Sequence, residues 1–86
     1  MHGSTALIDE LERLLAVVER LWSVEPPRRG ARALRQSLGR LEAQLRLLLL
    51  RARCGDASDS AWRETLACGR RLDRIRGEWH RSPLAA

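Results

Sequence analysis

Apolar residues recur at alternating steps of four and three along three separate stretches of this chain. The three runs are Leu7, Leu11, Leu14, Val18 and Leu21; Leu34, Leu38, Leu41, Leu45, Leu48 and Ala52; and Ala61, Thr65, Cys68, Leu72, Ile75 and Trp79. This spacing keeps one side of an α-helix against a neighbouring helix, turn after turn. The sequence therefore predicts an all-α fold built from three helices.

Proline and glycine separate the three predicted helices. Pro26 disfavours helix at the residue before it, Pro27 suits the first turn of a new helix, and Gly55 suits a helix end. The predicted helices span about residues 5–24, 28–53 and 58–80 of a single domain covering 1–86. Gly30 weakens the start of the second helix, so its firm part is expected from about Ala31.

Short links make successive helices antiparallel neighbours. The expected architecture is an up-down-up three-helix bundle, or a long antiparallel hairpin with the N-terminal helix laid alongside. Either arrangement places Trp22 and Trp79 at one end of the molecule and Trp62 at the other. Ser4 or Thr5 is expected to cap the first helix. The candidate caps of the third helix are Asp56, Ser58 and Asp59.

The charge is unevenly distributed. The formal net charge is +5, and every basic residue is Arg. Residues 1–25 carry −3, residues 26–54 carry +7 and residues 55–86 carry +1. An acidic first helix beside a basic second helix suggests complementarity within the molecule, which partly accounts for the basic excess without an external polyanion.

Nucleic-acid binding is the alternative explanation of the arginines. Residues 26–54 contain Arg28, Arg29, Arg32, Arg35, Arg40, Arg46, Arg51 and Arg53. These residues are spread around the predicted helix, and no aromatic residues are interleaved with them for base stacking. A solvated basic face is therefore favoured over a nucleic-acid site.

The second helix carries another apolar stripe. Ala43, Leu47, Leu50 and Cys54 cluster nearly opposite the run from Leu34 to Ala52. Either the first and third helices flank the second on both sides, or this stripe is exposed for a partner. The four residues of the second stripe are the candidate partner-binding residues.

Nothing in the sequence resembles a catalytic or cofactor site. There is no metal-ligand cluster, no nucleophile paired with a base and no glycine-rich phosphate loop, so we expect a non-enzymatic protein with no cofactor. Cys54 and Cys68 are expected to be free thiols, since a hairpin offsets them by roughly 12 Å, beyond the roughly 7 Å limit of a disulfide.

Acidic residues interrupt any N-terminal signal peptide, and the apolar run over residues 45–50 is shorter than the roughly 20 residues of a membrane span. A cytoplasmic location is therefore expected.

Residues 33–79 also carry a sequence pattern of three parts. Ala33-Leu34-Arg35-Gln36 opens an amphipathic helix, Arg53-Cys54-Gly55-Asp56-Ala57 makes a short break, and Trp62-Arg63-Glu64 starts a return helix. The pattern resembles the small YscE/SsaE-type co-chaperones of type III secretion systems. The resemblance implies a cytoplasmic helical hairpin that works with a helical-repeat chaperone to hold the needle subunit unpolymerised before export. A self-paired homo-oligomer is a further interpretation of the apolar stripes.

Overall fold

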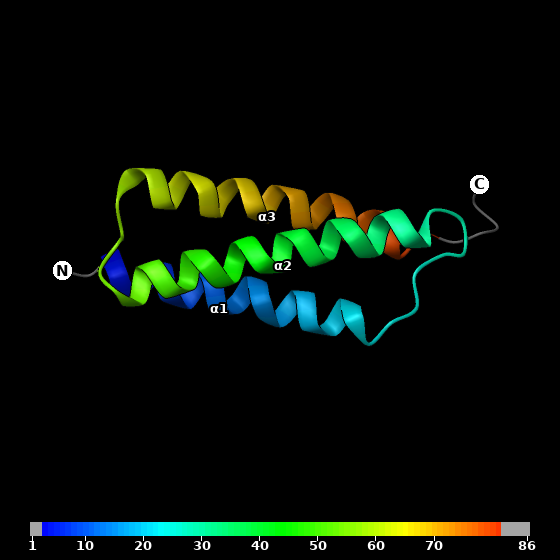
Figure 1. Ribbon diagram of the computed structural model, residues 1–86, viewed down its shortest axis with the longest axis horizontal. Helices are drawn as coiled ribbons and strands as arrows, with labels where there is room; N and C mark the ends of the chain where they lie inside the picture. The colour runs from blue at the N-terminus through cyan, green and yellow to red at the C-terminus, as the bar shows by residue number, and fades with distance from the viewer. Residues whose placement is uncertain (1–2, 82–86) are drawn as a thin grey trace.

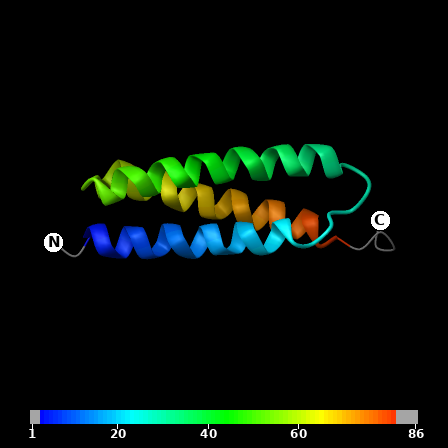
Figure 2. The ribbon, with the colours of Figure 1, turned by 60° about the horizontal axis from the view of Figure 1, so that its bottom comes forward.

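The computed structural model describes residues 3–81, which form three α-helices. Helix α1 spans Gly3–Trp22, α2 spans Ala31–Arg53 and α3 spans Asp59–Trp79. The helices run up, down and up along one long axis (Figure 1), and a turned view shows all three side by side (Figure 2). No strand is present among residues 3–81. The predicted all-α fold is confirmed, and it is a three-helix bundle in which α1 packs against both other helices.

The predicted apolar runs form the core. Every residue of the three runs is buried, and Thr65, the one polar member, donates a hydrogen bond of 2.8 Å from its Oγ1 to the Ala61 carbonyl oxygen. Leu15, Val17 and Leu49 are buried as well, although they lie outside the runs. These additions follow from the bundle: each helix contacts two neighbours, so its buried face is wider than a single heptad seam.

The link between α1 and α2 begins earlier than expected. Helix α1 ends at Trp22, and the Ser23 hydroxyl donates a 2.7 Å hydrogen bond to the Arg20 carbonyl oxygen. Helix α2 begins at Ala31, where the firm part of the second helix was expected, and residues 28–30 stay outside it because Gly30 has a φ of 78°. A left-handed residue cannot continue an α-helix, and glycine adopts this conformation without steric penalty.

The turn between α2 and α3 has well-defined caps at both helix ends. Gly55 has a φ of 102°, and its amide donates to the Ala52 carbonyl while the Asp56 amide donates to the Arg51 carbonyl. These two hydrogen bonds form a Schellman motif. Ser58 is the cap of α3, with its Oγ accepting from the Ala61 amide at 3.2 Å.

Three of the other cap candidates act differently. Asp56 supports the Ser58 cap: it accepts hydrogen bonds from the Ser58 hydroxyl and amide, which lower the pKa of its carboxyl group. Ser4 and Thr5 lie inside α1 and so do not cap it, because the helix begins at Gly3.

The tryptophans occupy the two ends of the bundle as predicted. The Trp22 and Trp79 rings meet edge to face, with their centroids 5.9 Å apart. Trp79 is buried and donates a 2.8 Å hydrogen bond from Nε1 to the Val24 carbonyl oxygen, which fastens the first loop to the end of α3. Trp62 lies in the first turn of α3, at the opposite end, and packs partly buried against the core.

Candidate partner-binding surface

The second stripe of α2 lies on the outside of the bundle. Ala43, Leu47, Leu50 and Cys54, hereafter the outer stripe, are all exposed. The exposed fraction is 50% for Leu47 and 60% for Leu50, and Leu50 is the most exposed large hydrophobic residue within 3–81. Leu45 and Leu48, which belong to the opposite face of the same helix, are 0% and 2% exposed.

The two neighbours of α2 cover its sides and leave the outer stripe uncovered. On the α3 side, Arg71 donates a 2.8 Å hydrogen bond from Nη1 to Oε1 of Gln44. On the α1 side, Trp22 donates from Nε1 to Oε1 of Glu42 at 3.1 Å. The first and third helices therefore flank α2 without covering the outer stripe, so the interpretation in which flanking helices bury this stripe is wrong. Leu49 is the residue that the flanking helices bury.

Arginines border the outer stripe. Arg46, Arg51 and Arg53 are all exposed. Arg46 pairs with Glu42 one turn earlier at 2.9 Å, and Arg53 pairs with Glu12 of α1 at 3.4 Å. The Arg53 pair is the one ion pair that links α1 to α2 within residues 3–81, and an exposed pair of this kind stabilises a fold by at most about 1 kcal/mol. The predicted charge complementarity between the two helices thus contributes little to their packing.

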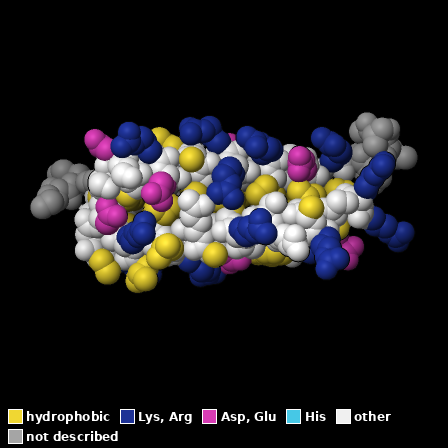
Figure 3. Space-filling view, turned by 45° about the horizontal axis from the view of Figure 1, so that its top comes forward, with side chains coloured by type: hydrophobic (Ala, Val, Ile, Leu, Met, Phe, Trp, Pro, Cys, Tyr) yellow, Lys and Arg dark blue, Asp and Glu magenta, His cyan; other side chains and the backbone are white. Residues whose placement is uncertain are grey.

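Leu66 adds an exposed apolar side chain on α3 that the sequence pattern did not single out. It is 51% exposed and follows the buried Thr65. Its position outside the four-and-three spacing of the third run was the one sequence feature that could have indicated its exposure. Figure 3 shows hydrophobic side chains gathered near one end of the molecule, with both acidic and basic side chains beside them.

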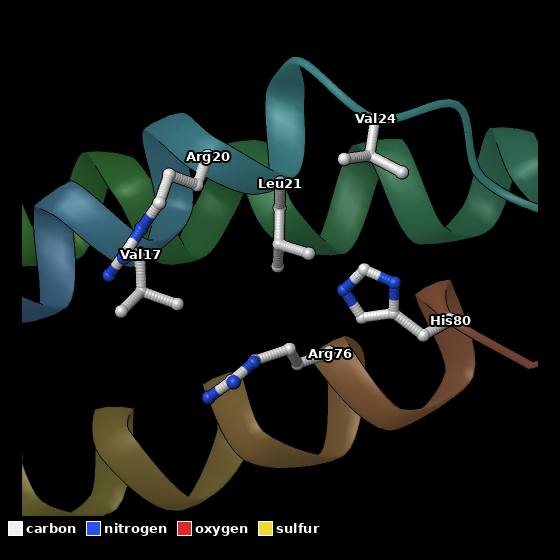
Figure 4. A pocket seen from close by; sticks show the side chains of 6 residues that line it. All are labelled: Val17, Arg20, Leu21, Val24, Arg76 and His80. Atoms are coloured by element: carbon white, nitrogen blue, oxygen red, sulfur yellow. The ribbon is translucent and has the colours of Figure 1, made fainter.

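A hollow lies between the C-terminal ends of α1 and α3. Its lining residues are Val17, Arg20, Leu21, Val24, Arg76 and His80 (Figure 4). Its volume is about 210 Å³, below the roughly 300 Å³ at which small-molecule sites begin. Arg20 and Arg76 lie in the last turns of their helices, where cations offset the negative end of the helix dipole. Their placement is explained by helix electrostatics without a ligand.

Side chains that could bind a metal ion or take part in catalysis do not cluster within the part of the chain that the structure describes. No three His, Cys, Asp or Glu side chains among residues 3–81 are placed to hold a metal ion. Cys54 and Cys68 are both free thiols, as expected, with Cys54 exposed and Cys68 buried. Burial raises the pKa of the Cys68 thiol, which keeps it protonated and unreactive. Ser58, at the start of α3, serves as a helix cap.

The arginines of residues 26–54 do not assemble into one basic groove. All eight are exposed, and two of them, Arg46 and Arg53, are paired with carboxylates. Figure 3 shows basic side chains scattered along the whole visible face, with acidic ones between them. None of the three described helices is both long and apolar enough to cross a membrane.

Comparisons with protein-family models, with curated proteins and with solved structures find no significant match.

Proposed function

We propose that this chain is a non-enzymatic helical protein-binding module, and that it works in the cytoplasm as a type III secretion co-chaperone. In this role it stabilises a helical-repeat chaperone and the needle subunit before export. One observation carries the binding part of the proposal: Leu47 and Leu50 stand half exposed on the face of α2 that neither neighbouring helix covers. The resemblance of residues 33–79 to the YscE/SsaE-type proteins supports the co-chaperone part.

The size of the exposed apolar area indicates the kind of interface. Full burial of one leucine side chain stabilises by about 1.5–3 kcal/mol, so covering the exposed halves of Leu47 and Leu50 contributes about 2–3 kcal/mol. Association costs about 4–15 kcal/mol in lost freedom. The two leucines therefore act as the centre of a wider contact, surrounded by Ala43, Cys54 and the stems of the bordering arginines.

A bound partner would also stabilise this chain. The domain is small, and leucines make up most of its core. A core built mainly from leucine does not define a single packing arrangement well. A partner that binds only the folded form stabilises it, and this stabilisation increases with the ratio of the partner's concentration to the Kd. The proposed mechanism is mutual: the module covers an apolar region of its partner, and the partner holds the module in its folded form.

The test is affinity capture from native cytoplasm with a double variant, Leu47→Asp and Leu50→Asp. We expect the variant to lose the captured protein while keeping its helical circular dichroism. The matched control is Ala33→Asp with Ser37→Asp, two exposed positions of the same helix that add the same charge. The control should retain the partner. Undiminished capture by a folded Leu47/Leu50 variant would remove the proposed binding surface.

The identity of the captured protein tests the co-chaperone part separately. We expect mass spectrometry to find a helical-repeat chaperone, a needle subunit or both. A discrete partner of another type, lost from the Leu47/Leu50 variant, would uphold the binding module and overturn the role in type III secretion.

A further inference from the structure

We propose that the partner segment seated on the outer stripe is an amphipathic α-helix whose apolar seam is bordered by acidic residues. This inference rests on the proposed function and specifies the chemistry of the partner. It is drawn from the spacing of the stripe and from the charges beside it.

The spacing of the outer stripe favours a helix as the occupant. Ala43, Leu47, Leu50 and Cys54 follow one another at steps of four, three and four, the spacing of a coiled-coil seam. The seam extends over about 16 Å, or three helical turns, from Ala43 to Cys54 at the C-cap of α2. An extended strand would find no backbone groups to pair with, because the amides and carbonyls inside α2 are engaged in the helix. A second helix can instead place its side chains between those of the stripe.

The residues beside the seam decide the charge of the partner. If Leu47 and Leu50 occupy the two apolar positions of a heptad, the flanking positions along the stripe are Gln44, Arg46, Arg51 and Arg53. Three of these four are basic, and the side chains of Arg46 and Arg53 are 59% and 57% exposed even in their ion pairs. Flanking side chains of one helix meet those of the other across a coiled coil, so acidic residues on the partner complement this border.

The same border argues against a second copy of this chain as the occupant. Two outer stripes packed together would bring the arginines of one copy against those of the other. Like charges at these positions oppose pairing and direct a helix towards a different partner. The apolar leucines at the centre also distinguish this surface from a phosphate-binding groove, in which basic side chains follow the nucleic-acid backbone.

The test uses two synthetic 21-residue helical peptides that share leucines at the seam positions. One carries Glu at every flanking position, and the other carries Lys. Binding of each labelled peptide to the full chain is followed by fluorescence anisotropy at low and high salt. We expect the Glu peptide to bind at least tenfold more tightly than the Lys peptide, with the difference shrinking as salt screens the charges. Equal affinities, or binding of neither peptide, would overturn the proposal.

Two variants separate binding at the stripe from general attraction to a basic protein. Arg46→Glu with Arg51→Glu should reverse the preference towards the Lys peptide. Arg28→Glu with Arg29→Glu changes the net charge equally in the exposed loop before α2 and should leave the preference intact. An equal loss of Glu-peptide binding in both variants would show nonspecific attraction and overturn the proposal.

Three further outcomes distinguish this inference from the function on which it rests. If native partner capture is lost on Leu47→Asp with Leu50→Asp but unaffected by Arg46→Glu with Arg51→Glu, the binding surface stands and the acidic border is wrong. If both double variants lose the native partner, both proposals are supported. If sedimentation of the isolated chain shows a dimer that the leucine substitutions break, a second copy occupies the stripe and the proposed acidic helix is excluded.

Discussion

Leu45 and Leu50 offer a stability comparison within one helix. Leu45 is 0% exposed and Leu50 is 60% exposed, so the same substitution by alanine should have very different effects. Removing the Leu45 side chain loses buried contacts and leaves a cavity, for an expected cost of about 3 kcal/mol within the 2–5 kcal/mol range of such changes. Leu50→Ala removes a side chain that is mostly in water, and alanine has the higher helix propensity. Its expected cost is below about 1 kcal/mol.

The assay is urea unfolding followed by circular dichroism, with thermal unfolding in parallel. A domain of this size has a total unfolding free energy of roughly 4–13 kcal/mol, so Leu45→Ala removes a large share of it. Its melting temperature should fall by about 12–24 °C. That of Leu50→Ala should fall by no more than about 8 °C. Equal destabilisation by the two variants would refute the assignment of Leu50 to the outside of the bundle.

Other substitutions and a labelling experiment test the local structure. Trp79→Phe removes the indole hydrogen bond to the first loop and should cost about 1–2 kcal/mol in urea unfolding. Ser58→Ala removes the α3 cap and should cost about 1 kcal/mol, whereas a larger loss would indicate a further role for this hydroxyl. Gly55→Ala should destabilise by about 1 kcal/mol because its φ is 102°; an unchanged midpoint would contradict the αL cap. With a thiol reagent, Cys54 should react at neutral pH and Cys68 only after unfolding, whereas rapid labelling of Cys68 in the folded protein would contradict its burial.

The leucine spacing was sufficient to predict the helices and most of the core. Each position of the four-and-three runs, from Leu7 in α1 to Trp79 in α3, is buried in the bundle. The spacing reports the seam on which a helix packs, and short links leave few ways to arrange three such seams. The meeting of Trp22 and Trp79 follows from the same reasoning, because α1 and α3 run parallel.

Helix boundaries and the outer surface were less accessible to sequence reasoning. The start of α2 depended on whether Gly30 would be helical or left-handed, and Pro27, three residues earlier, is compatible with either. The exposure of Leu47 and the burial of Leu49 depend on how far α1 and α3 wrap around α2. Wrapping of this kind is decided by side-chain packing between helices, which a pattern along one chain does not report.

Binding of a partner protein at the outer stripe is tested by photo-crosslinking in native cytoplasm, with benzoylphenylalanine placed at single positions. Leu50 reports on the outer stripe, and Ala16, exposed on α1, reports on a surface with no proposed partner. We expect a discrete protein adduct from position 50 and none from position 16. No adduct from position 50, or one from position 16 alone, would contradict binding at the outer stripe.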